Sequence, residues 1–308
     1  MPKRPRICVV GASNLDLISY VPRLPRMGET LHGSRFHMGF GGKGANQAVM
    51  AAKLGAEVAM VTKLGRDVFG ENTLKNFASF GIDTTHVRFT DKAFSGVAPI
   101  AVDEEGRNSI IIVTGANDLL TVEEIEAARP SIASAQVLVC QLEVPLEVSL
   151  AAMRIAREEK VTTIFNPAPG RPGLPDELFR LSDFLCPNES ETELITGLET
   201  KTQEQAIVAA RALLTRGAGK VILTLGERGS LLVTSTDFVL FPARKVKAVD
   251  STGAGDAYIG SLAFFIASGK PLEIAMKKAN DVAAMSVQLS GTQTSFPSAK
   301  DLPTELIE

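Results

Sequence analysis

The chain has 308 residues, of which 45% are hydrophobic and 22% charged, so it can bury a full core and suits one large domain or a domain with an appendage. Its formal net charge is −3, and no basic stripe alternates with aromatic residues, which argues against a nucleic-acid partner. No run approaches the roughly 18 apolar residues that a membrane span needs, so no membrane partner is expected. Cys8, Cys140 and Cys186 lie far apart in apolar segments and indicate buried thiols in a reducing compartment. We expect a cytoplasmic protein.

Short β-branched runs alternate along the chain with amphipathic helical stretches. Strands are expected at residues 7–12, 58–64, 136–142, 161–166, 184–187 and 220–225, and helices at 43–54, 69–80, 121–133, 146–159, 203–216, 255–268 and 271–289. Such a βαβ series predicts an α/β fold, a doubly wound and mostly parallel sheet flanked by helices. Ligands then bind beyond the carboxyl ends of the strands, so polar residues that directly follow a strand become candidates.

Two regions interrupt the alternation. Residues 29–40 and 95–113 are strand-like without intervening helices, and the second contains a turn at 103–106. They predict a small β-sheet lid, formed by insertions at about residues 14–40 and 95–115 of a single domain that spans residues 1–308. The apolar face of such a sheet needs a substrate or another subunit beneath it, so we expect a homodimer through the lid.

The segment at residues 39–47 offers several interpretations. Gly39, Gly41 and Gly44 have the spacing of a dinucleotide-binding fingerprint, which would indicate a nicotinamide oxidoreductase. That fingerprint should follow the first strand directly, whereas these glycines come much later. A phosphate-binding Walker loop fails as well, because no Ser or Thr follows Lys43. What remains is either a plain helix start or a loop that offers backbone amides, Lys43 and Asn46 to a polyhydroxylated ligand or its phosphate.

Polar side chains follow two of the predicted strands. Asn14 and Asp16 come after the first strand, and a spacing of two can point both to one side. An amide with a carboxylate suits vicinal hydroxyls, although an Asx turn would explain the pair equally well. Glu143 closes a later buried strand, with solvation at the surface as its alternative. Together these residues favour a sugar site.

Two further segments follow strands on the other half of the predicted sheet. Asn188 and Glu191 have the spacing of a capping box, which would be a purely structural role. The alternative is that Glu191, through water, helps hold Mg²⁺ on the phosphates of a nucleotide. Thr224, Gly226 and Gly229 form a sharp turn, which suits a nucleotide-lining loop or a simple hairpin. Both alternatives remain open from the residues alone.

The most informative segment lies at residues 250–256. Gly253, Ala254 and Gly255 let backbone N–H groups converge at the start of an apolar helix, which makes a site for negative charge. Asp256 lies beside it and can take a proton from a hydroxyl that attacks a phosphate. The alternative is that Asp256 only complements the helix dipole. Phosphoryl transfer is therefore the hypothesis.

Residues 41–47, Gly-Gly-Lys-Gly-Ala-Asn-Gln, and residues 250–256, Asp-Ser-Thr-Gly-Ala-Gly-Asp, resemble the two signatures of the ribokinase (PfkB) family of carbohydrate kinases. The resemblance covers essentially the whole chain and includes the segments at 140–143, 166–169, 188–191, 224–229 and 291–295. It implies a ribokinase-like fold and ATP-dependent phosphorylation of D-ribose at the O5 hydroxyl. Relatives that act on other sugars or on nucleosides share the second signature, so another kinase activity of the family is the alternative. A catalytically silent metabolite-binding protein is a further alternative, which the intact Gly255 and Asp256 argue against.

The resemblance also implies roles for individual residues. Asp256 would accept the proton of the sugar hydroxyl, and the amides of Gly253, Ala254 and Gly255 would form an anion hole. The sugar would be held by Asn14, Asp16, Gly42, Lys43, Asn46, Glu143 and Asp256. The nucleotide would be lined by Asn188, Thr224, Gly226, Gly229, Gly255 and Asn280. The cofactors implied are ATP, Mg²⁺ near Glu191 through water, and K⁺ at Asp250, Thr252, Ser286, Leu289, Gly291 and Ser295.

Overall fold

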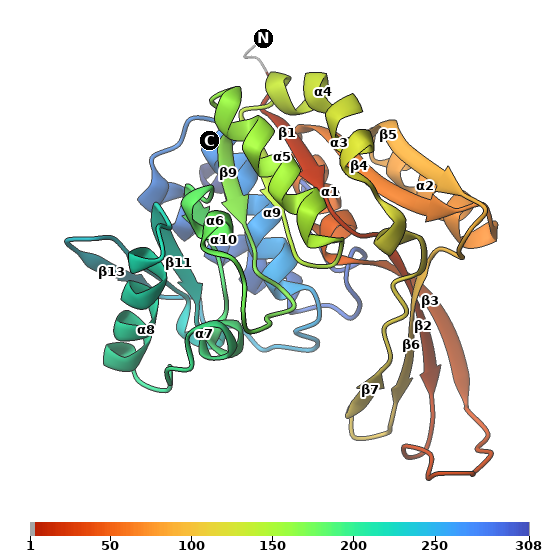
Figure 1. Cartoon of the computed structure of the whole chain (residues 1–308). Coiled ribbons are helices and arrows are strands. Elements are labelled where there is room, and N and C mark those ends of the chain that lie inside the picture. The colour runs from red at the N-terminus through yellow and green to blue at the C-terminus, as the bar shows by residue number, and fades with distance from the viewer. Residues whose placement is uncertain (1–3, 308) are drawn as a thin grey trace.

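A computed structural model describes residues 4–307, and its larger sheet has nine strands (Figure 1). In their order across the sheet they are β13 (Phe238–Phe241), β12 (Ser230–Val233), β11 (Lys220–Thr224), β10 (Phe184–Leu185), β9 (Thr162–Phe165), β8 (Val137–Cys140), β1 (Arg6–Val10), β4 (Glu57–Gly65) and β5 (Asp83–Thr90). All neighbours from β11 to β5 pair in parallel, and β12 and β13 extend the sheet in antiparallel fashion. The predicted doubly wound, mostly parallel sheet is confirmed.

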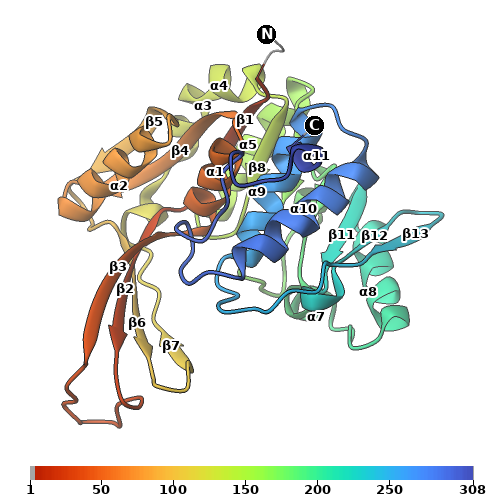
Figure 2. The same ribbon diagram turned by 180° about the vertical axis from the view of Figure 1, so that it is seen from behind.

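Helices cover both faces of this sheet, because its central strands are apolar on both sides. In β1, Cys8 and Val10 enter one core cluster, and Ile7 and Val9 enter the other. The first face packs against α3 (Val122–Ala127), α4 (Arg129–Ser134), α5 (Leu146–Glu158), α6 (Asp176–Arg180), α7 (Glu189–Thr196) and α8 (Gln203–Thr215). The second packs against α1 (Lys43–Lys53), α2 (Val68–Ser79), α9 (Ala254–Ala267) and α10 (Leu272–Ser286), which Figure 2 shows from behind. Short helices complete the chain at η1 (Gly115–Leu119), η2 (Gly226–Arg228) and α11 (Thr304–Ile307).

A second sheet projects away from this body in both views (Figures 1 and 2). Its four strands are, in order, β3 (Arg35–Gly41), β2 (Asn14–Tyr20), β6 (Gly96–Val102) and β7 (Asn108–Ile110). The predicted small sheet is confirmed, and we call these four strands the lid. The first strand-like region is shorter than expected, because β3 begins only at Arg35. In the lid register Asp16 lies opposite Gly39 and Ala98, so these three residues share one face.

Two predicted helices differ from the structure. The helix expected at 121–133 is broken into α3 and α4 at Ala128, because Pro130 in the first turn of α4 has no N–H to continue the ladder. The helix expected at 271–289 ends at Ser286 as α10, and the chain then turns toward Gly291, whose φ of 89° is left-handed. That early end leaves the last carbonyls of α10 without partners within the helix.

The three cysteines are buried free thiols, as the sequence predicts. Burial raises the pKa of Cys8 to about 12, so this thiol stays protonated and unreactive at neutral pH. Among residues 4–307, no helix combines the length and the apolar character that crossing a membrane requires.

Candidate active site

A cavity of about 180 Å³ lies at the carboxyl ends of the central strands, where the N-termini of α1 and α9 meet the loops after β9, β10 and β11. Its lining consists of Lys43, Asn166, Ala168, Cys186, Asn188, Glu191, Thr224, Gly253, Gly255, Asp256 and Ile259. Most of these positions were predicted from their place after a strand or at a helix start. The fold therefore joins the 41–47 and 250–256 segments, which are some 200 residues apart, into one site.

The first turn of α9 presents open amide donors to this cavity. Gly253, which precedes the helix, has a left-handed φ of 79°, and no side chain caps α9. Ala254 N donates to Ser251 O at 3.2 Å, whereas the amides of Gly253 and Gly255 have no acceptor within the described residues. A Cβ on Gly255 would meet nothing within 4 Å, so this residue borders open space. The free donors and the positive end of α9 suit an anion.

Asp256 projects from the same turn and is 8% exposed. Its carboxylate accepts a hydrogen bond on each oxygen, from Gln47 Nε2 to Oδ1 and from Asn46 Nδ2 to Oδ2, both at 2.9 Å. Asn46, predicted to contact the sugar, thus contacts the predicted base. Gln47 was not predicted as a site residue, and its position beside Asn46 in the 41–47 segment is the only signal in the sequence.

The start of α1 lies directly against the end of β1. A Cβ on Gly42, whose φ is 86°, would come within 2.8 Å of Ala12 O, so only glycine fits there. Lys43 N donates to Glu143 Oε2 at 2.8 Å. Burial raises the pKa of Glu143 even though Lys43 opposes it. Burial alone would lower the pKa of Lys43, but the carboxylates around it, that of Asp256 first, outweigh burial and raise it.

Asp16 reaches toward the same group of acids from the lid. Burial first, and then the charges of Glu143 and Asp256, raise its pKa to about 6. A Cβ on Gly41 would lie 2.6 Å from Asp16 Oδ1, so the glycine makes room for the carboxylate. The predicted sugar carboxylates are therefore close enough to influence one another and the predicted base.

Asn14 is held in one orientation by Asn117, a residue of η1 that sequence reasoning missed. Asn117 Nδ2 donates to Asn14 Oδ1 at 2.8 Å, and Asn117 Oδ1 accepts from Ser13 N at 2.9 Å. Asn117 is 1% exposed, and Asn14 Nδ2 has no acceptor within residues 4–307. Asn14 therefore presents its N–H donors, and not its oxygen, to a ligand.

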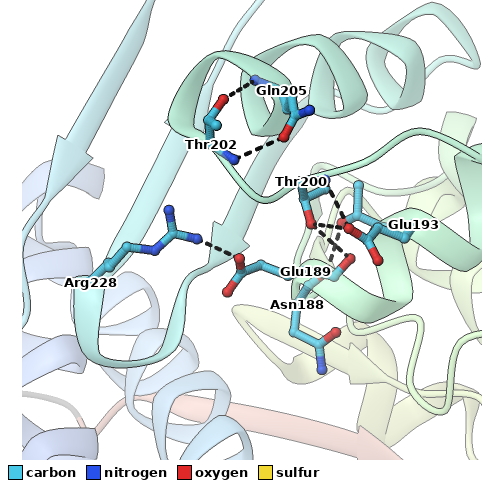
Figure 3. Close-up of polar contacts among 8 residues, drawn as sticks. Asn188, Glu189, Glu193, Thr200, Thr202, Gln205 and Arg228 are labelled. Carbon is cyan, nitrogen blue, oxygen red and sulfur yellow. Dashed lines mark hydrogen bonds and ion pairs between the residues drawn. The ribbon is translucent and has the colours of Figure 1, made fainter.

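The N-terminus of α7 forms a capping box, which confirms that interpretation of residues 188–191. Asn188 Oδ1 accepts from Glu191 N, and Glu191 Oε2 accepts from Asn188 N, both at 2.8 Å. Burial raises the pKa of Glu191, against the effects of the Asn188 amide and Lys43. Arg228 of η2 binds Glu189 at the start of this helix (Figure 3). The ion pair ties α7 to the turn that follows β11.

That turn is the hairpin between β11 and β12, in which Thr224 pairs with Ser230. Gly226 and Gly229 both have positive φ, of 56° and 100°, and a Cβ on Gly229 would lie 2.1 Å from Phe241 O. Asn280 Nδ2 donates to the same carbonyl at 2.9 Å. Thr224 lines the cavity, whereas Asn280 is not part of its lining and contacts the end of β13.

The segments predicted to hold a monovalent cation also lie together. Asp250 accepts from Thr252 N on Oδ1 and from Gly291 N on Oδ2, both at 2.9 Å. Burial alone would raise the pKa of Asp250, but these hydrogen bonds, that of Gly291 first, outweigh burial and lower it. Ser286 and Ser295 are both buried, whereas Leu289 is 59% exposed. The described residues contain no cluster of three or more His, Cys, Asp or Glu side chains suited to a metal.

Comparison with known proteins supplies the family. The pfkB family of carbohydrate kinases matches residues 4–299. The chain belongs to this family. Among members of the pfkB family, the chain is 45% identical over 304 residues to the ribokinase of Mus musculus, covering 97% of this chain and 94% of that protein. It is 44% identical over 292 residues to the deoxyribokinase of Salmonella typhi, covering 95% of each.

A solved structure extends the likeness of this pfkB-family chain to three dimensions. The ribokinase of Arabidopsis thaliana, complexed with ribose and ATP, superposes with a TM-score of 0.91. The two chains are 30% identical, and the match covers 99% of each. The ribokinase-like fold expected from the sequence is confirmed, including its small second sheet.

Proposed function

We propose that this chain transfers a phosphoryl group from ATP to the O5 hydroxyl of D-ribose, giving ADP and ribose 5-phosphate. The observation that carries the proposal is Asp256, held between two amide donors beside the open N–H groups of Gly253 and Gly255. The ribokinases of mouse and Arabidopsis support the choice of substrate.

In this proposal Asp256 accepts the proton of the attacking hydroxyl. A loose phosphoryl-transfer transition state releases that proton late, so an ionised carboxylate is a sufficient base. The charge that gathers on the transferred phosphoryl oxygens meets the open amides of Gly253 and Gly255 at the positive end of α9. The amide of Ala254, the third predicted donor, would have to leave Ser251 O to join them. The two open donors are fixed before the reaction, and such preorganised electrostatics often supply the largest share of catalysis.

The sugar would be bound between the lid and the start of α1. Asn14 would donate to one hydroxyl and Asp16 would accept from its neighbours, while Glu143 holds the Lys43 amide in place. The residues that we propose to surround the sugar are Asn14, Asp16, Gly42, Lys43, Asn46, Glu143 and Asp256.

The nucleotide would lie over α7 and the β11–β12 hairpin. We assign it to Asn188, Thr224, Gly226, Gly229, Gly255 and Asn280. The cavity region combines four acids with Lys43 as the nearby cation, so phosphates need an additional cation there. Mg²⁺ would supply that charge, and Glu191 fits an outer position, because its Oε2 serves the capping box and leaves Oε1 for a bound water.

A K⁺ site fits the place where residues 249–252 meet the chain that follows α10. Val249 N and Asp250 N both donate to Val287 O, which holds residues 249–252 beside the end of α10. The ionised carboxylate of Asp250, together with nearby backbone carbonyls, would supply the oxygen ligands that a monovalent cation prefers. We propose ligands among Asp250, Thr252, Ser286, Leu289, Gly291 and Ser295, with the ion stabilising the 250–256 turn.

We further propose that the chain is a single kinase domain that forms a homodimer through its lid. Phe36 and Met38 of β3 are 60% and 48% exposed, and both project on the lid face opposite Asp16. One lid face would then cover the sugar while the other packs on a second copy. The buried free thiols support a cytoplasmic location.

The second candidate is a deoxyribokinase, which the Salmonella relative favours. The test is ADP release at catalytic protein concentrations with ribose, deoxyribose, fructose, adenosine and ribose 5-phosphate, first in K⁺ and then in Na⁺. We expect ribose to give the highest kcat/KM, and K⁺ to raise the rate. A preference for deoxyribose would support the second candidate, and no turnover with any acceptor would overturn both.

A further inference from the structure

A chain of buried side-chain amides surrounds the carboxylate of Asp256. Its first two members, Asn46 and Gln47, are neighbours on α1, and each donates to one carboxylate oxygen. A carboxylate oxygen can accept two hydrogen bonds, so each keeps a lone pair for a substrate hydroxyl. The direction in which those lone pairs point depends on how firmly the two amides are held.

Gln47 is held by amides from two strands of the main sheet. Gln141 Nε2, just after β8, donates to Gln47 Oε1 at 2.6 Å. Gln47 Nε2 also donates to Asn166 Oδ1 at 3.2 Å, and Asn166 Nδ2 donates to Cys186 O at 2.8 Å. A flipped Gln47 amide would place its oxygen against Asp256 Oδ1 and its nitrogen against Gln141 Nε2. Only the observed orientation gives both N–H groups of the Gln47 amide an acceptor and its oxygen a donor.

Asn46 is held in the same way from the C-terminal part of the chain. Gln293 Nε2 donates to Asn46 Oδ1 at 3.0 Å, and Asn76 Nδ2 of α2 donates to Gln293 Oε1 at 2.9 Å. Lys53 Nζ donates to the backbone carbonyl of Gln293 at 2.7 Å, which fixes the segment that carries it. Gln293 therefore determines which end of the Asn46 amide faces Asp256.

We propose that Gln47 and Gln293 are positioning residues of the phosphoryl-transfer step, an inference that rests on the proposed function. Gln47 is fully buried and Gln293 is 6% exposed, and neither lines the cavity. They act on the reaction through Asp256, Gln47 directly and Gln293 through Asn46. Because reacting groups must be aligned closely, small displacements of a base reduce turnover while substrate binding is retained.

The experiment compares Gln47→Leu with the wild type. Leucine has a similar volume but no donor, so Asp256 Oδ1 loses its partner. We expect kcat to fall at least about tenfold, with KM for the sugar and for ATP changed less than about twofold. The matched control is Gln205→Leu on α8, which loses side-chain hydrogen bonds to Thr202 N and Glu199 (the Thr202 contacts are drawn in Figure 3). Its kcat should equal that of the wild type.

A double variant separates positioning from general loss of structure. In an Asp256→Asn protein, adding Gln47→Leu should leave the residual kcat unchanged, because the positioned carboxylate is already gone. A further drop as large as that in the wild type would overturn the inference, and so would a Gln47→Leu protein with normal kcat. If Gln47→Leu does not fold, Gln293→Leu is tested by the same design. A wild type that releases no ADP with any sugar would overturn the proposed function first, and this inference with it.

Discussion

At the residue scale, the site depends on charged groups whose pKa values the fold has moved. Asp16 is the clearest example, because burial and two neighbouring acids raise its pKa to about 6. In the folded chain this carboxyl binds its proton more tightly than in the unfolded chain. Its contribution to stability therefore becomes less favourable as pH rises from about 4 through 6.

Sugar binding should reverse that effect on Asp16. Hydroxyls that donate to the carboxylate favour its charged form, so binding should release a proton near pH 6 and tighten as pH rises through 6. Titration calorimetry with ribose, in two buffers of different ionisation enthalpy, measures the proton released. In Asp16→Asn the release should disappear, and proton uptake by the wild type would contradict this role.

Gly255 allows stability and activity to be separated. Alanine at this position meets no neighbour within 4 Å and favours a helix by about 1 kcal/mol over glycine, so Gly255→Ala should fold with an unchanged or higher Tm. Its methyl group would occupy the space proposed for phosphate, and kcat/KM for ATP should fall at least about tenfold.

A contrasting glycine lies in the same helix. A Cβ on Gly260 would come within 2.6 Å of Gln47 O, so Gly260→Ala should lower stability by about 1 to 3 kcal/mol. Thermal unfolding and steady-state kinetics of both variants check this contrast. Normal kinetics of Gly255→Ala would contradict the assignment of the anion hole to that turn.

At the element scale, η1 holds the start of the lid strand β2. Asn117 binds Ser13 and Asn14 on one side and the carbonyl of Thr114 on the other, at 2.9 Å. Asn117→Ala would leave buried polar groups without partners and free the Asn14 amide to rotate. We expect KM for ribose to rise about tenfold with a smaller change in kcat, whereas Asn108→Ala on exposed β7 should change neither.

The predictions that succeeded at this scale concern elements with one clear sequence pattern. The strands that are buried on both faces, such as β8, are short unbroken apolar runs, and the residues after them point into the site. The strand β5 was missed, because it lies at the edge of the sheet and mixes exposed and buried residues. The break between α3 and α4 follows from Pro130. One helix was predicted there because the apolar residues keep a helical period across the break.

The positioning amides show where sequence reasoning ends. Gln47 and Asp256 are separated by 209 positions, and Gln293 and Asn46 by 247. Nothing local distinguishes these amides from ordinary polar residues. The packing of α1 against α9 brings Gln47 to Asp256, and the return of the chain after α10 brings Gln293 to Asn46. The places of the open glycine turn and of the strand-end acids could be predicted, because they follow from the local backbone.

At the scale of the whole molecule, the lid has two faces, the face of Asp16, which we propose to cover the sugar, and an opposite face with exposed apolar side chains. Met38→Glu would place a charge on the face opposite Asp16, where Phe36 is also exposed. Sedimentation should show a dimer for the wild type and a monomer for Met38→Glu. Asn108→Glu, on the Asp16 face of the lid by register, should remain a dimer, and a monomeric wild type would contradict the lid interface.

The turnover number of Asp256→Asn with ribose and ATP tests the central claim most directly. Asparagine keeps the size of the side chain but cannot take the hydroxyl proton. We predict that kcat falls by about 10²-fold or more while thermal unfolding shows an intact fold. A variant that turns over ribose at nearly the wild-type rate would contradict the assignment of Asp256 as the base.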